Sequence, residues 1–522
     1  MKLVLLSSLS ALLVVSGMFM STLWFLSILG VTLYVGVLYA IPADARREAL
    51  KSGWIFGIVY CGAVFSVFWQ TLPLTWLGIH DGTLGFTLVL SVWASLTLIL
   101  GIFFALFAAL FVRFRTNTAW DIVWISALWT LVQYLQMWGF TVLTIGSSSS
   151  WDAHFSALMA GYALAGFSPL LQIASIGGIY LLTYTLCAIG CALYFAWQSY
   201  CTTRKRTTSF LIAWCLIGGT LSLADTHFTL VPERVHNETI SVALLSTDYT
   251  RTDPDALRDV GGREYDTALR VWALDHAPPD IVVFPENAAF FKHASTTPNE
   301  YRDAVFGNAP VSFIDTEFVV GQNTKSVQMY FHGDTHSVTY QKMFLSPFGE
   351  YIPWLYEFGL KLVLGSTRAS LITGAFDLTP GTSLPVAQLG TASVGGLFCS
   401  DIFSPSLYRV LTEKGATVLV NAASQSIFQP LGRADTATQM AAQVRAVETG
   451  RYLLLASNGA PSSIISHRGK IIMRSSPGHV SVLSAEVPLR DSTTIFVRIG
   501  DFILAIFVLL LILPLCIRAK SE

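Results

Sequence analysis

The sequence predicts a membrane domain of about eight transmembrane α-helices joined to an outer α/β domain. The first observation is composition, since 53% of the 522 residues are hydrophobic, 12% are charged and the mean hydropathy is +0.57. A soluble protein carries about 25% charged residues. The second is that long uncharged stretches alternate with short basic loops over residues 1–226. The third is that residues 227–500 have an ordinary globular composition with short β-rich runs.

Seven of the eight helices are expected in the first 226 residues. No charged side chain occurs from Leu3 to Ile41. A spanning helix needs about 20 apolar residues, so we interpret this stretch as two helices that turn near Met18–Ser21. Further apolar stretches lie at residues 53–79, 84–112, 120–145, 169–199, 209–225 and 502–517. The predicted organisation is a seven-helix domain (1–226), an outer domain (227–500), and a last helix with its tail (501–522).

Basic residues in the short loops predict the orientation, because Lys and Arg accumulate on the cytoplasmic side of membrane proteins. If the N-terminus is cytoplasmic, one side of the membrane holds Lys2, Arg46, Arg47, Lys51, Arg113, Arg115, Arg204, Lys205, Arg206, Arg518 and Lys520. Both termini are then cytoplasmic and the outer domain is extracytoplasmic. The formal net charge of −1 gives no indication of nucleic-acid binding.

The outer domain is expected to be an α/β domain with a layered sheet core. Short runs rich in Val, Ile, Leu and Phe and bounded by turn residues predict buried strands. These runs lie at residues 239–247, 280–286, 318–322, 337–344, 392–400, 416–424 and 452–460. Residues 435–450 predict a helix that stops at Gly450. Alternation of strands and helices is typical of α/β layers.

Three of these runs contain a reactive group at or near their ends, namely Glu286, Lys342 and Cys399. A thiolate nucleophile needs a base to take its proton and a donor to hold the developing oxyanion. Each residue alone has an ordinary explanation, since a lone Cys is most often a small buried hydrophobe and a loop Lys or Glu is usually solvated. Together they fit nucleophilic catalysis without a histidine.

Cys399 is the one cysteine of seven that lies in the outer domain. It therefore has no partner within that domain, and we expect it to be reduced and unpaired even in an oxidising compartment. No Cys or His cluster has metal-ligand spacing, so no metal site is expected.

Sequence motifs around these three residues resemble those of a known family. The motifs are FPENA at Glu286, YQKMFLSPFGEYIP at Lys342 and VGGLFCSDIFSP at Cys399. They resemble the apolipoprotein N-acyltransferases, a membrane-embedded branch of the nitrilase superfamily. The resemblance implies an α-β-β-α nitrilase-like outer domain between a seventh and an eighth helix. It implies Glu286 as general base, Lys342 as oxyanion stabiliser and Cys399 as nucleophile, supported by Glu350, Ser400 and Asp401.

The resemblance also implies the reaction and its partners. A fatty acyl group would pass from a phospholipid through a Cys399 thioester to the N-terminal amine of a diacylglyceryl-cysteine lipoprotein. No cofactor is required. The expected location is the bacterial cytoplasmic (inner) membrane, with the catalytic domain on the periplasmic or extracytoplasmic side and the chain acting as a monomer.

The chain departs from the family pattern at three places. Ser400 and Asp401 stand where the family usually has Tyr-Glu, residues 423–429 replace a Ser-Asn-Asp-Ala-Trp-Phe-Gly motif, and Gln133 replaces a common Glu. Two alternatives therefore stay open. One is a membrane-tethered nitrilase-like hydrolase or an acyltransferase for another amine. The other is a non-catalytic paralogue that binds lipoproteins or lipids.

Aromatic residues beside Glu286 and Lys342 predict a path for lipid. Aromatic side chains in apolar loops are costly on a soluble surface but common at a bilayer interface. The alternative is that they belong to the domain core. The residues expected to line the path are Phe290, Phe291, Phe344, Trp354 and Tyr356.

The predicted orientation can be tested with a topology reporter. A reporter that is active only outside the cytoplasm should be active when it is fused after Asp225, because the basic loops place this position on the outer side. Activity at that position of a reporter that works only in the cytoplasm would contradict the orientation. Fusion after Lys520 is the matched control and should give the opposite result.

Overall fold

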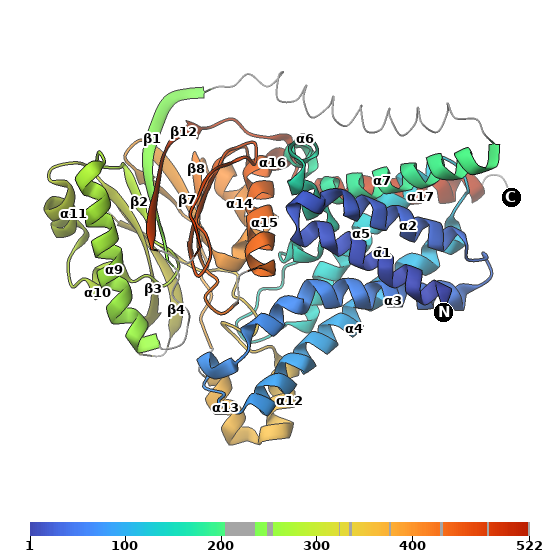
Figure 1. Cartoon of the computed structure of the whole chain (residues 1–522), viewed down its shortest axis with the longest axis horizontal. Coiled ribbons are helices and arrows are strands. Elements are labelled where there is room, and N and C mark those ends of the chain that lie inside the picture. Colours follow the sequence, from blue (N-terminus) through green and yellow to red (C-terminus); the bar gives the residue numbers. More distant parts are fainter. Residues whose placement is uncertain are drawn as a thin grey trace.

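A computed structural model describes residues 1–203, 235–247, 254–322, 324–333, 337–374, 377–428, 432–477 and 480–519. Two parts lie side by side in Figure 1. One is a bundle of apolar helices, and the other is a pair of β-sheets with helices on both outer faces, here called the sandwich. The predicted boundary at residue 226 lies outside the described residues.

Five helical segments among the described residues are long and apolar enough to cross a membrane by length and composition. They are Lys2–Phe19, Ser21–Tyr39, Arg46–Thr71, Gly82–Phe114 and Ala174–Cys201. The first two confirm the predicted division of the uncharged N-terminal stretch. The predicted span at 209–225 lies outside the described residues.

The bundle contains α1 (Lys2–Phe19), α2 (Trp24–Tyr39), α3 (Arg46–Val64), α4 (Gly82–Phe114), α5 (Trp120–Leu143), α6 (Ser168–Leu171), α7 (Ala174–Thr203) and α17 (Phe502–Ala519). The last helix, α17, packs against α5 and α7. Helix α4 has 33 residues, which correspond to about 50 Å at 1.5 Å per residue. That length exceeds the roughly 30 Å of a hydrocarbon core, so one end of α4 extends beyond it.

The sandwich contains two six-stranded sheets of the same design. The strand orders are β12-β1-β2-β3-β4-β5 and β11-β10-β9-β8-β7-β6. In each sheet three parallel strands, β1-β2-β3 or β7-β8-β9, have one antiparallel strand on one side and two on the other. The strands of the first sheet are β1 (Val235–Ser246), β2 (Ile281–Val283), β3 (Ser312–Val320), β4 (Lys325–His332), β5 (Ser337–Gln341) and β12 (Ser481–Arg490).

The second sheet consists of β6 (Val386–Leu389), β7 (Ala392–Phe398), β8 (Val418–Ser424), β9 (Tyr452–Asn458), β10 (Ser463–Ile465) and β11 (Ile471–Arg474). A bridge between Thr247 and Asn458 joins the carboxyl ends of β1 and β9. The carboxyl ends of the central strands of both sheets therefore meet in one place. Parallel strands present their chemistry at this edge.

Helices cover both outer faces of the sandwich. The outer layer of the first sheet contains α9 (Pro254–Asp275), α10 (Phe290–His293) and α11 (Pro298–Phe306), and α14 (Pro405–Glu413) and α15 (Arg433–Thr449) cover the second sheet (Figure 1). This arrangement is the expected α-β-β-α layering. Helix α15 ends at Gly450 as predicted, because Gly450 adopts a left-handed φ of 68° that glycine accommodates without strain.

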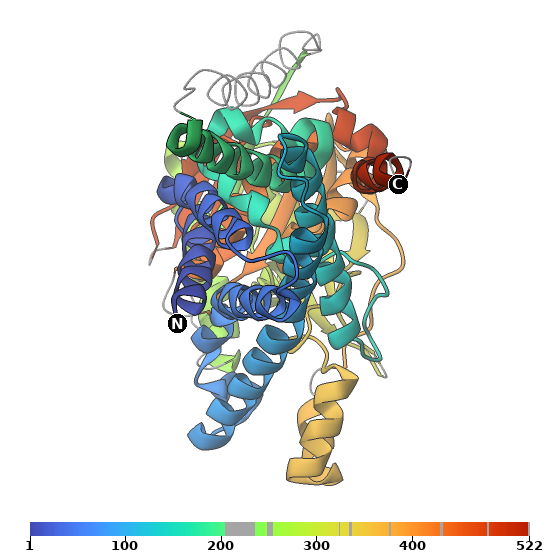
Figure 2. The ribbon, with the colours of Figure 1, turned by 90° about the vertical axis from the view of Figure 1, so that its right-hand side faces the viewer.

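A helical hairpin projects from the sandwich on the same side as α4. It consists of α12 (Trp354–Leu364) and α13 (Ser366–Gly374), and Figure 2 shows it extending away from the body of the molecule in the same direction as α4. The Tyr356 hydroxyl on α12 lies 2.6 Å from the Ser95 hydroxyl on α4. The bundle and the sandwich therefore touch at this distal point as well as along α15.

A buried charge joins α15 to the bundle. Glu448 Oε1 accepts the Ile179 N–H at 2.7 Å, and Arg445 Nη2 donates to the same oxygen at 2.9 Å. The side chains of Arg445 and Glu448 are fully buried. The Ile179 N–H is available because Gly177 and Gly178 interrupt α7 with non-helical dihedral angles. The short helix α16 (Ile495–Ile499) packs beside this break.

Substitution of Gly178 should destabilise the joint between bundle and sandwich. Gly178 has φ 61° and ψ −159°, a conformation that is essentially restricted to glycine and costs other residues roughly 1–3 kcal/mol. A Cβ there would also lie 2.5 Å from the Phe496 ring and 2.9 Å from Glu448 Oε1. Gly178→Ala should therefore lower the melting temperature in detergent. Gly82→Ala is the matched control, because its Cβ would meet nothing within 4 Å. Equal melting temperatures for both variants would contradict the prediction.

Candidate active site

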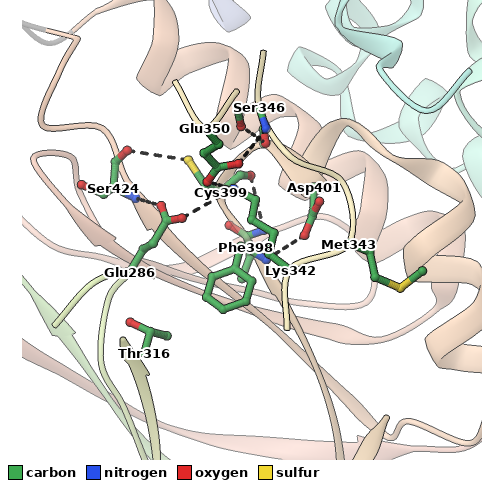
Figure 3. A network of polar contacts seen from close by, with 12 residues as sticks. Glu286, Thr316, Lys342, Met343, Ser346, Glu350, Phe398, Cys399, Asp401 and Ser424 are labelled. Atoms are coloured by element: carbon green, nitrogen blue, oxygen red, sulfur yellow. Dashed lines mark hydrogen bonds and ion pairs between the residues drawn. The ribbon is translucent and has the colours of Figure 1, made fainter. Parts of the chain in front are cut away.

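Glu286, Lys342 and Cys399 converge where the carboxyl ends of the strands meet. Glu286 lies three residues after β2, Lys342 follows β5 directly, and Cys399 follows β7 directly. Figure 3 shows the Lys342 side chain between Glu286, Glu350 and Asp401, with the Cys399 sulfur beside Ser424. Glu286 and Cys399 are 113 positions apart in the sequence, and they form one cluster with Lys342 because the carboxyl ends of strands from both sheets meet at this point.

Lys342 is a buried cation between two carboxylates. Its Nζ lies 2.8 Å from Glu350 Oε1 and 3.6 Å from Glu286 Oε1, and its side chain is 1% exposed. Burial on its own lowers the pKa of Lys342, but the charges of Glu350 and Glu286 oppose it, and the net effect is a pKa well above the usual value. Lys342 therefore stays protonated at neutral pH. An ammonium has three donor hydrogens, so two carboxylates leave one for another acceptor.

The thiol and Glu286 contact the same residue. Ser424 donates its N–H to Glu286 Oε2 at 3.0 Å, and its carbonyl oxygen lies 3.6 Å from Cys399 Sγ. Cys399 is a free thiol. Burial, followed by the charge of Glu286, raises the pKa of the Cys399 thiol above its ordinary value. The resting site therefore holds a neutral thiol, and a nucleophilic thiolate requires proton transfer to a base.

The backbone at the site is held in unusual conformations. Cys399 has φ 35°, and the neighbouring loops contain Asn287 at 62°, Ala289 at 45° and Phe348 at 67°. Residues other than glycine adopt positive φ infrequently, and such strain concentrates at functional sites. Cys399 also begins a short 3-10 helix, Cys399–Phe403. The first N–H groups of a helical turn have no carbonyl partner inside it, so the Ser400 N–H is a donor beside the sulfur.

Ser400 and Asp401 adjoin the cluster through different contacts. The Ser400 hydroxyl lies 2.6 Å from that of Ser346, whose N–H donates to Glu350 Oε2 at 2.6 Å. Asp401 accepts the Phe398 N–H at 3.1 Å and is 1% exposed. Burial raises the pKa of Asp401 to about 7, although the Lys342 charge opposes this shift. Asp401 thus adds a group that titrates near neutrality.

The cluster opens into a cavity of about 1070 Å³ that extends to the bundle. Glu286, Lys342, Glu350, Cys399 and Asp401 line its polar end. Apolar side chains of α4 and α12 line its other end, including Leu84, Leu88, Val92, Leu355, Leu360 and Val363. The arrangement can hold a long apolar chain with its polar end at the thiol.

The predicted lipid path needs correction at three residues. Phe344 and Tyr356 do line the cavity. Phe290 and Phe291 instead belong to the core between the first sheet and its outer helices, where Phe290 stacks on Phe284 at 4.5 Å. The reason is that the backbone turns sharply at Asn287 and Ala289 and directs α10 away from the thiol.

Trp354 is the third correction. It is 52% exposed at the start of α12 and does not belong to the cavity lining, whereas its neighbour Leu355 does.

Gln133, the departure in the fifth predicted span, is buried in the bundle. It donates to the Tyr60 hydroxyl and the Leu158 carbonyl, both at 2.9 Å. Gln133 does not belong to the cavity lining.

Several residues at the site carry no signal of their own in the sequence. Ser346, Ser424, Gln425 and Asn458 all line the cavity. Ser424 ends a predicted strand and Gln425 follows it, so the rule that chemistry gathers at strand ends is the signal that identifies their neighbourhood.

Comparison with known proteins agrees with this geometry. Residues 10–192 match the model of the apolipoprotein N-acyltransferase N-terminal domain, and residues 298–495 match the carbon-nitrogen hydrolase model. An apolipoprotein N-acyltransferase of Nitrosomonas europaea is 27% identical over 91% of this chain and 89% of its own length. One of Pseudomonas putida is 26% identical over 94% of this chain and 92% of its own length. The chain belongs to the apolipoprotein N-acyltransferase family.

Membership of the apolipoprotein N-acyltransferase family accounts for both parts of the molecule, because residues 10–192 lie in the bundle and residues 298–495 lie in the sandwich. The protein is therefore a multi-pass membrane protein with a nitrilase-like domain. Among solved structures, an amidase of the nitrilase superfamily from Nesterenkonia AN1 aligns with 53% of this chain and 98% of its own at 18% identity and a TM-score of 0.35. The family models and the two sheets, rather than that score, carry the fold assignment.

The titration of Asp401 gives a testable pH dependence of stability. Its pKa is about 7 in the folded protein and near 3.9 in an unfolded chain. The folded state therefore binds more protons between these values, and Asp401 makes the protein less stable as pH rises from about 4 to about 7. Asp401→Asn removes this contribution. We expect the melting temperature of Asp401→Asn minus that of the parent protein to increase as the pH rises from 5 to 8.

Both proteins share every other titrating group, so the difference between their melting temperatures isolates Asp401. A difference that stays constant across this pH range would contradict the assigned titration.

Proposed function

We propose that this protein transfers a fatty acyl group from a phospholipid, through a thioester on Cys399, to the N-terminal amine of a diacylglyceryl-cysteine lipoprotein. One observation carries the proposal. A single cavity connects apolar side chains of α4 and α12 to a thiol whose surroundings include Glu286 and Lys342. The family relatives carry the name of this activity. The sandwich would then lie on the extracytoplasmic side of a bacterial inner membrane.

The first half-reaction forms the thioester. Glu286 takes the thiol proton, and Cys399 Sγ forms a bond to the carbonyl carbon of a phospholipid ester. The resulting oxyanion accepts hydrogen bonds from Lys342 Nζ and the Ser400 N–H. When the tetrahedral intermediate collapses, the carbon–oxygen bond breaks and the lysophospholipid leaves with the proton held by Glu286. Lys342 suits this role because it is charged and held in place by Glu350 before the substrate arrives.

The second half-reaction consumes the thioester. The α-amine of the lipoprotein attacks the same carbonyl carbon and gives a proton to Glu286. The carbon–sulfur bond then breaks, and the Cys399 thiolate recovers the proton. An amide is more stable than a thioester, so the transfer is downhill and needs no cofactor.

Water competes with the amine for the thioester. The apolar lining of the cavity opposes it, since an acyl chain that fills this space displaces water from the reacting carbon. An acyl chain left in water rather than in this apolar space would cost about 0.8 kcal/mol per methylene. The same chain therefore holds the donor in place and keeps the thioester dry. All of these groups come from one chain, and we take the monomer to be the working unit.

The proposal is tested by incubating the purified protein with phospholipid alone. An adduct of acyl mass should accumulate on Cys399 and should be released by neutral hydroxylamine, as intact-protein mass spectrometry would show. Cys399→Ala should form no adduct. Glu286→Gln should form it more slowly by roughly 10²–10⁴-fold, the usual size of general-base assistance. Lys342→Met should also be slow because the oxyanion loses its charged donor.

Cys201 provides a matched control, because it is an exposed free cysteine outside the cavity lining. Cys201→Ala should form the adduct at the parent rate. If no phospholipid yields an adduct on the parent protein, the enzyme proposal fails and a lipid- or lipoprotein-binding paralogue takes its place. If water discharges the adduct as fast as a diacylated lipopeptide does, the protein is a hydrolase.

A further inference from the structure

Arg433 is a cation of the cavity lining that has no carboxylate partner. Among the residues that the structure describes, the lysine and arginine side chains that line the cavity are Lys292, Lys342 and Arg433. Lys342 lies between two carboxylates, and Lys292 is paired with Glu317. Arg433 is exposed and forms no ion pair with any described residue. Its charge is therefore available to an anionic ligand of the cavity.

The Arg433 guanidinium is held where the sandwich meets the bundle. Arg433 is the first residue of α15. Its Nη1 donates to the hydroxyl of Ser66, which lies in the 3-10 helix Phe65–Thr71 after α3. Its Cζ lies 6.0 Å from the centroid of the Phe19 ring at the end of α1. A guanidinium has five donor hydrogens, so the bond to Ser66 leaves others for a ligand.

The contact with Phe19 gives the depth of Arg433 relative to the membrane. Helix α1 has 18 residues, which correspond to about 27 Å at 1.5 Å per residue. This length is close to the roughly 30 Å of a hydrocarbon core. The N-terminus lies at the end of the bundle away from the sandwich (Figure 1). Phe19 therefore lies near the surface of the core on the side of the sandwich, at the level of the lipid headgroups.

The thiol end of the cavity is not suited to a phosphate group. There the Lys342 ammonium lies 3.6 Å from Glu286 and 2.8 Å from Glu350, so two carboxylates surround one cation. A phosphodiester would add a further negative charge, and like charges that lie close together oppose binding. The phosphate of a lipid whose ester lies at the thiol is therefore expected beside another cation of the lining. Arg433 is the one whose charge is not already compensated by a described carboxylate.

We propose that Arg433 binds the phosphate of the phospholipid donor and thereby selects phospholipids over neutral acyl lipids. Arginine binds phosphate through two parallel charge-assisted hydrogen bonds. The diacylglyceryl-cysteine of the acceptor has no phosphate, so the contact belongs to the donor. The inference rests on the proposed acyl transfer and assigns a specificity-determining residue to its first half-reaction. Arg433 positions the donor and takes no part in proton transfer.

The test measures formation of the Cys399 adduct from two lipids that have the same acyl chains. One is phosphatidylglycerol, and the other is glucosyl diacylglycerol, whose headgroup is neutral and contains no phosphate. Each is titrated in detergent micelles, and the rate is followed by intact-protein mass spectrometry. The parent protein should reach half its maximal rate at about tenfold to a hundredfold less phosphatidylglycerol than glycolipid, which is the usual effect of a hydrogen bond to a charged group.

Arg433→Met removes the charge and should need as much phosphatidylglycerol as glycolipid, while its maximal rate stays that of the parent protein. Arg433→Lys keeps a cation and should keep part of the preference. Lys292→Met is the matched control, because Lys292 is a cation of the same lining whose charge Glu317 already compensates. It should keep the parent preference. A diacylated lipopeptide should discharge the adduct at the same rate in all four proteins, since this step involves no phosphate.

Several results would overturn the inference while leaving acyl transfer intact. One is a parent protein that uses both lipids equally, and another is Arg433→Met with its preference retained. A third is an equal loss of rate with both lipids, which would make Arg433 a structural residue or a contact for bulk lipid.

A binding measurement separates this inference from the proposed function. Cys399→Ala cannot form the adduct, so its affinity for phosphatidylglycerol is measured without reaction. Adding Arg433→Met to it should weaken binding of phosphatidylglycerol by about tenfold or more and leave binding of the glycolipid unchanged. Equal affinities for phosphatidylglycerol with and without Arg433→Met would overturn the inference, whatever the parent protein does with either lipid. A parent protein that forms no adduct would overturn the proposed function alone.

Discussion

The buried ammonium of Lys342 is the constraint around which the sandwich is arranged. A charge removed from water is tolerated only where opposite charges and hydrogen bonds compensate it. Glu286 comes from the loop after β2, and Glu350 comes from the loop after β5. Both loops follow strands of the first sheet, so this sheet alone supplies the cation and its two carboxylates. The thiol at the end of β7 enters the same space.

Compensation at Lys342 also decides the state of its neighbours. Glu350 receives the Ser346 N–H, and Ser346 contacts Ser400, so the loop after β5 is fixed to the residue that follows the thiol. Burial, followed by the negative charge of Glu286, raises the pKa of the Cys399 thiol, so the thiol is neutral at rest. In the proposed acyl transfer, Lys342 would be in place before negative charge develops on the substrate. Such preorganisation is the main source of electrostatic catalysis.

Much of this arrangement follows from local patterns in the sequence. The runs ending near Glu286, Lys342 and Cys399 form β2, β5 and β7, and residues 435–450 form most of α15. The expected strand at 318–322 is only the end of β3, and the predicted runs did not include β4, β6, β10, β11 or β12. The mixed polar pattern of β4 carries only a weak period-two signal. Phe290 packs in the core of the sandwich because the backbone turns at Ala289. The pattern of apolar residues does not predict this turn.

The contact between Ile179 and Glu448 has a consequence for biosynthesis, since 269 positions separate its two ends. Helix α7 leaves the ribosome long before α15, so the broken turn at Gly177 and Gly178 lacks its carboxylate partner during most of translation. Loop closure over such a separation is slow compared with helix formation. Helix α17, which packs on α5 and α7, is made last. The bundle can therefore complete the contact between Ile179 and Glu448, and its packing on α17, only after α15 and α17 have been synthesised.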